Sequence, residues 1–146
     1  MIEILKMNEA HVFEVAELEK ACFALPWPFE TLLNVLHNPL SVLYVALKQG
    51  DVVGYVNMQH ILDEGYIANL AVSPNERNQR IARALLSKLV EYAVKNQMSF
   101  LTLEVRKSNT AAIHLYSGMG FLTEGERKGF YDHPKEDAFI MTRRFY

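Results

Sequence analysis

The 146-residue sequence predicts an α/β domain built on one mixed sheet. Three observations lead to this fold class. Strand-like and helix-like segments follow one another in the order βααβββαβαββ. Three consecutive strand-like runs are joined by connections too short for crossovers, so they pair antiparallel. A long amphipathic segment then separates the third run from the next, as in a right-handed parallel crossover through a helix.

The N-terminal part predicts one short strand and two helices. Residues 2–5 form the expected strand. Asn8 is a suitable N-cap for a helix over 9–22, where apolar residues recur at helical spacing. The proline-flanked Trp27 interrupts this pattern, and a second helix is expected from Phe29 to about residue 37.

An antiparallel meander is expected next. Its three strands cover 41–48, 52–60 and 66–72, and they are rich in β-branched and aromatic residues. Turn signals at 49–51 and 63–65 separate them. Because these connections are short, we expect the three strands to lie side by side in the sheet, in the order of the sequence.

The second half predicts the crossover and the end of the sheet. The expected elements are a helix over 78–96, a strand over 99–106, a helix that Ser108 or Asn109 caps and that ends near Gly120, and strands over about 121–130 and 136–144. The chain shows no linker, repeat or low-complexity segment, so we expect a single domain over residues 1–146.

The charge balance excludes one class of function. Fifteen Lys+Arg residues stand against 17 Asp+Glu residues, which gives a net charge of −2. Broad nucleic-acid binding requires many phosphate contacts from basic side chains. We therefore expect no direct nucleic-acid partner.

Cysteine, histidine and hydropathy patterns narrow the setting. Cys22 is the only cysteine, so neither an internal disulfide nor a cysteine-based zinc site is available. The five histidines lack metal-ligand spacing, and we expect no metal. The sequence has neither a signal-peptide pattern nor an apolar run long enough to span a bilayer, which predicts a cytoplasmic protein without a membrane partner.

A basic segment opens the long helix of the second half. Arg77, Arg80, Arg83 and Lys88 face one acid, Glu76, an excess of three positive charges (4 − 1). A helix N-terminus adds unpaired N–H groups and the positive end of its dipole, so a phosphate could bind here. From charge alone, a solvated basic helix face is the simpler interpretation.

Two further residues are candidates for proton chemistry. Glu104 lies near the carboxyl end of a strand, where ligands of α/β sheets bind, and it could serve as a general base. The alternative is an ion pair with Arg106 or Arg127 on an exposed face. Tyr116, on the next helix, could donate a proton to a leaving group, or it could be a core tyrosine.

Two runs of residues carry a resemblance to a known family. The first is Leu70-Ala71-Val72-Ser73-Pro74 followed by Arg77-x-x-Arg80-Ile81-Ala82-x-x-Leu85-Leu86. The second is Leu103-Glu104-Val105-Arg106-x-Ser108-Asn109-x-x-Ala112-x-x-Leu115-Tyr116-x-x-x-Gly120-Phe121. The first resembles the acetyl-CoA-binding motif of the Gcn5-related N-acetyltransferase (GNAT) superfamily, and the second resembles its bacterial ribosomal-protein-alanine N-acetyltransferase branch. The resemblance covers essentially the whole chain and implies the GNAT fold.

The resemblance implies a binding site for acetyl-CoA. Backbone groups of Leu70, Ala71 and Val72 would hold its pantetheine and thioester region. The backbone of Arg77, Asn78, Gln79, Arg80, Ile81 and Ala82 would hold its pyrophosphate, and Asn109 and Tyr116 would also contact it. The family usually has Gly-x-Gly or Gly-x-Ala where this chain has Arg80-Ile81-Ala82. Because backbone amides form the cradle, we expect cofactor binding to survive this departure.

The implied reaction is direct transfer of acetyl from acetyl-CoA to the N-terminal α-amine of a protein, in particular a ribosomal protein that begins with Ala. Glu104 matches the general base of the family and Tyr116 its general acid. Trp27, Phe29, Tyr131 and Asp132 are expected to flank the peptide groove, and Asp132 or Glu136 could attract the cationic acceptor. The alternatives are a lysine or small-molecule amine as acceptor, or a non-catalytic acyl-CoA-binding regulatory domain.

Overall fold

Seven strands form one sheet in the order β1-β2-β3-β4-β5-β7-β6 in the computed structural model, which describes residues 1–77 and 80–145. The strands are β1 (Ile2–Lys6), β2 (Ser41–Lys48), β3 (Asp51–Ile61), β4 (Glu64–Val72), β5 (Phe100–Arg106), β6 (Leu122–Asp132) and β7 (Lys135–Arg144). β4 and β5 pair in parallel, whereas the other neighbours in this order pair antiparallel. The expected mixed sheet and its single parallel crossover are therefore confirmed.

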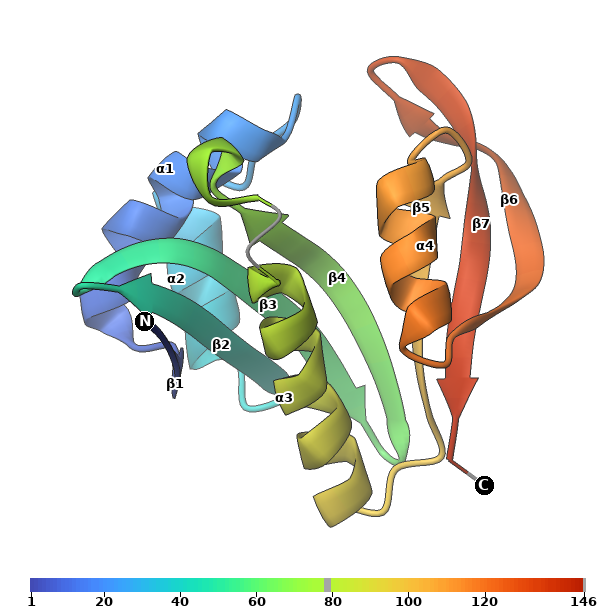
Figure 1. Ribbon diagram of the computed structural model, residues 1–146, viewed down its shortest axis with the longest axis horizontal. Helices are drawn as coiled ribbons and strands as arrows, with labels where there is room; N and C mark the ends of the chain where they lie inside the picture. Colours follow the sequence, from blue (N-terminus) through green and yellow to red (C-terminus); the bar gives the residue numbers. More distant parts are fainter. Residues whose placement is uncertain (78–79, 146) are drawn as a thin grey trace.

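Four α-helices cover the sheet in the described part of the chain: α1 (Val12–Cys22), α2 (Phe29–His37), α3 (Ile81–Lys95) and α4 (Thr110–Gly118). Figure 1 shows α1 and α2 behind the sheet and α3 and α4 in front of it. The element order is the one that the sequence predicts. None of the described helices has the length and apolar character needed to cross a membrane.

Two helix starts differ from the expectation. Asn8 does cap the first helical segment, where its side chain accepts a hydrogen bond from the Ala10 N–H, but residues Glu9–His11 form a 3₁₀ turn before α1. The long helix begins at Ile81 because Arg80 adopts a left-handed conformation with φ 62°. Residues 78 and 79, which the sequence placed in this helix, lie outside the described residues.

Each face of the sheet carries its own apolar core. On the α3 side, Leu85, Leu86 and Leu89 pack with Met58 and Leu101, and all five are fully buried. The second core consists of side chains from α1, α2 and the strands they cover: Met7, Val12, Val15, Ala16, Leu18, Leu32, Leu43, Val45, Tyr55 and Ala71. Apolar residues thus recur at helical spacing in α1 and α3 because each helix covers one face of the sheet.

β4 contains a bulge that changes which side chains face which core. Asn69 lies opposite Asn57 and Ile67 lies opposite Met58, which leaves Ala68 as the extra residue. In a regular strand, residues 67, 69 and 71 would share one face. Here Ile67 belongs to the α3 core and Ala71 to the α1–α2 core. The bulge therefore turns the end of β4, with Asn69, toward α1.

β4 and β5 are hydrogen-bonded neighbours only at the start of each strand. Their register covers Glu64–Tyr66 against Phe100–Thr102 and ends there. Figure 1 shows the two strands meeting at one end of the sheet and diverging toward the other. The carboxyl halves of both strands are thus left to bound the pocket described below.

The short β4–β5 contact predicts a steric limit at Gly65. A Cβ atom there would lie 2.5 Å from Leu101 Cδ2 and 2.9 Å from Met58 Sδ. We expect Gly65→Ala to lower the free energy of unfolding by about 1–3 kcal/mol, measured by urea denaturation. Gly125→Ala is the matched control, because its Cβ would meet Ile140 Cδ1 at 3.5 Å. Equal stability of the two variants would contradict this packing.

Candidate active site

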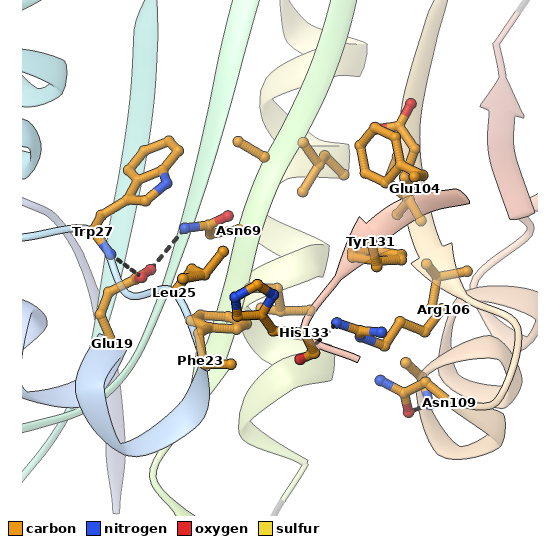
Figure 2. Close-up of a pocket in the computed structure, with 18 of the residues that line it drawn as sticks. Glu19, Phe23, Leu25, Trp27, Asn69, Glu104, Arg106, Asn109, Tyr131 and His133 are labelled. Carbon is orange, nitrogen blue, oxygen red and sulfur yellow. Dashed lines mark hydrogen bonds between the residues drawn. The ribbon is translucent and has the colours of Figure 1, made fainter. Parts of the chain in front are cut away.

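A pocket of about 360 Å³ opens where β4 and β5 diverge. Its lining comes from four places: α1 with the α1–α2 connection, the end of β4, the end of β5 with α4, and the end of β6 with the β6–β7 turn. Figure 2 shows Glu19, Trp27 and Asn69 on one side of it and Glu104, Arg106 and Tyr131 on the other. This is the position, outside the carboxyl ends of strands, where α/β proteins bind their ligands.

Glu104 lines this pocket and also forms an ion pair. Its Oε2 accepts a hydrogen bond from Arg127 Nε at 3.1 Å. The pair that the sequence offered as an alternative is thus present, with Arg127 as the partner. Since the Arg127 side chain is 55% exposed, the pair is screened by water and contributes little stability. Arg127 can therefore leave Glu104 at small cost when another cation approaches.

Tyr116 projects from α4 into the same pocket, and it is buried. Burial raises the pKa of its phenol, and the nearby Tyr131 adds to this effect. The pKa of Tyr131 is raised as well, first by burial and then by the charge of Glu104. Tyr116, Tyr131 and Glu104 are therefore electrostatic neighbours, and both phenols keep their protons at neutral pH.

The β6–β7 turn is fastened to β5 by polar contacts. Arg106 donates hydrogen bonds to the backbone oxygens of His133 and Pro134, and its guanidinium lies 4.3 Å from the Tyr131 ring centroid. Glu136 accepts hydrogen bonds from the backbone N–H and hydroxyl of Ser108. Glu136 is thus occupied with Ser108 and Arg106 and is not part of the pocket lining, whereas Asp132 is.

The predicted aromatic wall is only partly in place. Trp27, Tyr131 and Asp132, which the sequence assigned to the peptide groove, line this pocket. Phe29 does not: it is the first residue of α2, and it remains 41% exposed outside the lining. Pro28, the extended N-cap of α2, separates the two aromatic residues, and Phe23 and Leu25 line the pocket instead.

Sequence reasoning missed a buried polar cluster on the β4 wall. The Glu19 side chain is completely buried, and its Oε1 accepts a hydrogen bond from the Trp27 N–H at 2.8 Å. Its Oε2 accepts from Asn69 Nδ2 at 2.7 Å and from the Tyr55 hydroxyl. Burial, then the charge of Glu19, raises the pKa of Tyr55. The available signal was a carboxylate beside Leu18 in the apolar stripe of α1.

A second pocket, of about 650 Å³, lies where α3 begins. Arg77, Arg80 and Arg83 line it, and Arg77 Nε donates a hydrogen bond to the Val72 oxygen at 3.2 Å, while the carboxylate of Glu76 pairs with Lys48 at 3.0 Å. The remaining lining residues are Val72, Ile81, Ala82, Ala111, His114, Leu115 and Gly118. Three cations beside a helix N-terminus suit an anionic ligand such as a diphosphate.

The other predicted cofactor contacts occupy different places. Leu70 lines the first pocket, and Val72 the second, while Ala71 is buried in the α1–α2 core. Asn109 lines the first pocket, and its side chain caps α4 by accepting a hydrogen bond from the Ala112 N–H. Asn78 and Gln79 lie outside the described residues.

Comparison with known proteins gives a consistent result. The sequence profile of the acetyltransferase (GNAT) family matches residues 12–121. The chain is 32% identical over 139 residues to a putative [ribosomal protein bS18]-alanine N-acetyltransferase of Bacillus subtilis, which covers 94% of this chain and 92% of that protein. It is 33% identical over 126 residues to the [ribosomal protein bS18]-alanine N-acetyltransferase of Escherichia coli K12, covering 85% and 84%.

Solved structures show the same fold. The crystal structure of the ribosomal-protein-S18-alanine N-acetyltransferase from Escherichia coli superposes with a TM-score of 0.92 at 30% identity, covering 99% of this chain and 94% of that one. Arabidopsis thaliana NAA60 in complex with acetyl-CoA also gives a TM-score of 0.92, covering 99% of both chains. At 20% identity, this second likeness concerns the fold alone.

The left-handed Arg80 predicts a gain in stability on substitution by glycine. A side chain at φ 62° costs about 1 kcal/mol relative to glycine, which adopts this conformation freely. We expect Arg80→Gly to raise the melting temperature. Arg83→Gly, three residues on and inside α3, is the control and should lower it, because glycine weakens a helix interior. A fall in melting temperature for Arg80→Gly would contradict the strain at this position.

The hydrogen bonds that Glu136 accepts predict that the stability of the protein depends on pH. The hydrogen bond from the Ser108 hydroxyl, with further help from Ser108 N–H and Arg106, holds the pKa of Glu136 below its usual 4.5. The contribution of this carboxylate is therefore full above about pH 4.5 and is lost as the pH falls below that value. We expect the difference in melting temperature between the wild type and Glu136→Gln to shrink from pH 6 to pH 3. A difference in melting temperature that stays constant over this pH range would contradict the lowered pKa of Glu136.

Proposed function

Since the chain belongs to the acetyltransferase (GNAT) family and is an N-acetyltransferase, we propose that its acceptor is the N-terminal α-amine of a protein, in particular a ribosomal protein that begins with Ala. One structural observation supports the chemistry above all others. Glu104 and Tyr116, which come from two consecutive elements, both line the pocket where β4 and β5 diverge. The bS18-alanine acceptor in the names of the relatives supports the choice of substrate.

The residues present suit acetyl-CoA as the acetyl donor. Arg77, Arg80 and Arg83 provide positive charge for its phosphates beside the start of α3. β5 does not pair with β4 beyond Tyr66, which leaves the β4 edge open to an extended ligand up to Val72, whose backbone oxygen accepts hydrogen bonds from Arg77 Nε and Cys22 Sγ. When bound, the group supplies an acetyl thioester that a neutral amine can attack.

Glu104 is proposed as the base that removes a proton from the acceptor. A protein α-amine has a pKa of about 7.7–8.0, so about a tenth of it is neutral at pH 7. A lysine amine with a pKa near 10.4 is about a thousandth neutral or less. A carboxylate that acts directly or through water is adequate for the first amine and poorly suited to the second. This difference favours an α-amine over lysine.

Tyr116 is proposed to act on the departing sulfur. The reference pKa of a thiol, about 8.5, lies below that of a phenol, about 10. Burial raises the pKa of Tyr116 further, so transfer of its proton to a fully formed thiolate is uphill. Its role is then to donate a hydrogen bond to the sulfur while negative charge develops there. The proton of the acceptor amine leaves separately, through Glu104.

Acetyl-CoA binding is the first test of this proposal. We expect calorimetry to detect a one-to-one complex despite Arg80 in the place of the usual glycine, because backbone amides form the phosphate cradle. Arg77→Ala and Arg83→Ala should each weaken binding, with Lys128→Ala, a surface cation on β6, as the control. A wild-type protein without measurable affinity for acetyl-CoA would refute the proposed donor.

Thiol release from acetyl-CoA tests the acceptor. Peptides that begin with Ala should give the highest rates, ahead of the same peptides with a blocked N-terminus and an internal lysine, and ahead of polyamines. Higher turnover with the blocked lysine peptides would replace the α-amine by a lysine acceptor. Acetyl-CoA binding without release by any amine would favour the non-catalytic alternative.

The two proposed catalytic side chains are tested by near-isosteric variants. We expect Glu104→Gln and Tyr116→Phe each to lower kcat by at least about tenfold, with little change in acetyl-CoA affinity. Glu124→Gln and Tyr92→Phe are matched controls. Glu124 also pairs with an arginine, and Tyr92 is also partly buried, but neither lines the pocket. Full kcat in both pocket variants would remove the assigned roles.

A further inference from the structure

The buried cluster of Glu19, Tyr55 and Asn69 has no role in the reaction as derived so far. The cluster lies on the β4 side of the pocket, and two of its members, Glu19 and Asn69, line the pocket. We propose that the side-chain oxygen of Asn69 binds an N–H of the acceptor amine, and that Glu19 and Tyr55 are positioning residues that turn this oxygen into the pocket. This inference rests on the proposed function, because it concerns the same acceptor.

The hydrogen bonds of Glu19 determine which way the Asn69 amide points. A carboxylate can only accept hydrogen bonds, so the group of Asn69 that contacts it must be the NH₂. Asn69 Nδ2 lies 2.7 Å from Glu19 Oε2 and 3.1 Å from the Tyr55 hydroxyl oxygen. The Tyr55 proton is itself committed to Glu19. The Asn69 oxygen must therefore point to the opposite side, and Figure 2 shows it directed away from Glu19.

In the described part of the chain, Asn57 of β3 makes no competing contact with this amide. Asn57 lies directly opposite Asn69 across the β3–β4 pair and is completely buried. Within residues 1–77 and 80–145, Asn57 makes no hydrogen bond to Asn69, although it is close enough to the Tyr55 hydroxyl to lower the pKa of that phenol. The side chain of Asn69 hydrogen-bonds Glu19 and Tyr55, and these contacts set its orientation. A reversal of the Asn69 amide requires a change in one of these two side chains.

The β4 bulge places this oxygen across the pocket from Glu104. Because Ala68 is the extra residue, Asn69 faces α1, and both Asn69 and Glu104 line the space between the diverging strands. A neutral amine has N–H donors and one lone pair. If its donors are held by the Glu104 carboxylate and by the Asn69 oxygen, its lone pair is left free for the acetyl carbon. Two acceptors on opposite walls therefore orient the nucleophile.

The second oxygen of Glu19 links the orientation of the Asn69 amide to the position of the Trp27 segment. Glu19 Oε1 accepts from the Trp27 N–H at 2.8 Å, so one buried carboxylate holds both the Trp27 segment and the Asn69 amide. An acceptor amine that meets the NH₂ of Asn69 instead would face a donor where it needs an acceptor. The loss of one such hydrogen bond corresponds to about a tenfold loss in kcat/KM.

An exchange of carboxylate and amide tests the proposal. In Glu19→Gln, the new NH₂ must face Asn69 and Tyr55, which turns the Asn69 NH₂ into the pocket. In Asn69→Asp, two carboxylates face each other. In the double variant E19Q/N69D the net charge is unchanged, the introduced amide donates to the introduced carboxylate, and the second oxygen of that carboxylate again faces the pocket. Glu17→Gln is the control, since Glu17 lies on the same helix with an exposed side chain.

The readouts are acceptor kcat/KM with the best amine of the wild type, the Kd of acetyl-CoA, and the melting temperature. We expect about a tenfold or greater loss of acceptor kcat/KM in each single variant, and recovery to at least about a third of the wild-type value in E19Q/N69D. The Kd of acetyl-CoA should stay within about twofold throughout. A full kcat/KM in Glu19→Gln, an additive loss in the double variant, or a parallel loss of acetyl-CoA affinity would each overturn the proposal.

A second measurement does not depend on turnover. The side-chain NH₂ protons of Asn69 should exchange slowly with solvent in ¹⁵N NMR spectra of the wild type, and rapidly in Glu19→Gln. Rapid exchange in the wild type would overturn the inference for Asn69 even if α-amines prove to be the acceptor. Slow exchange in a protein that prefers lysine peptides would instead refute the proposed acceptor and leave the orientation of Asn69 intact.

Discussion

β4 and β5 pair over residues 64–66 and 100–102 only, and the rest of the site depends on this early separation. Two parallel strands that part leave backbone groups of β4 without partners on β5, which is costly unless a ligand or water binds them. The separation also brings the carboxyl ends of both strands to the edge of a cavity. Glu104 and Asn69 line opposite sides of this cavity, because each lies beyond the last residue that pairs β4 with β5.

The walls of the pocket are held by different kinds of contact. On the β4 side, the buried Glu19 carboxylate is saturated by donors from three segments of the chain. On the β5 side, Arg106 and Glu136 fasten the β6–β7 turn through contacts that remain accessible to water. A buried charged hydrogen-bond cluster is costly to break, whereas exposed pairs are not. Tyr131, at the end of β6, lies on this more accessible wall.

The two pockets divide the charges of a nearly neutral protein. The net charge is −2, yet Arg77, Arg80 and Arg83 line the pocket at the start of α3. Glu104 and Asp132, in contrast, line the pocket where β4 and β5 diverge. Such a distribution attracts an anionic ligand to one place and a cationic amine to the other. The overall charge predicts no broad nucleic-acid binding, whereas the distribution of charge fits the two substrates of the proposed reaction.

The sequence by itself determined the element order, the crossover and the position of Glu104, because periodicity and short connections are local properties. It could not decide the side-chain environment. The role of Glu19, the bulge at Ala68, the exclusion of Phe29 from the pocket and the choice of Arg127 as the partner of Glu104 all depend on segments far apart in the chain. A carboxylate in an apolar helix stripe looks unfavourable until Tyr55, Asn69 and Trp27 surround it. Only the packing of α1 against β3 and β4 supplies those donors, so the tertiary structure alone determined this buried cluster beside the pocket.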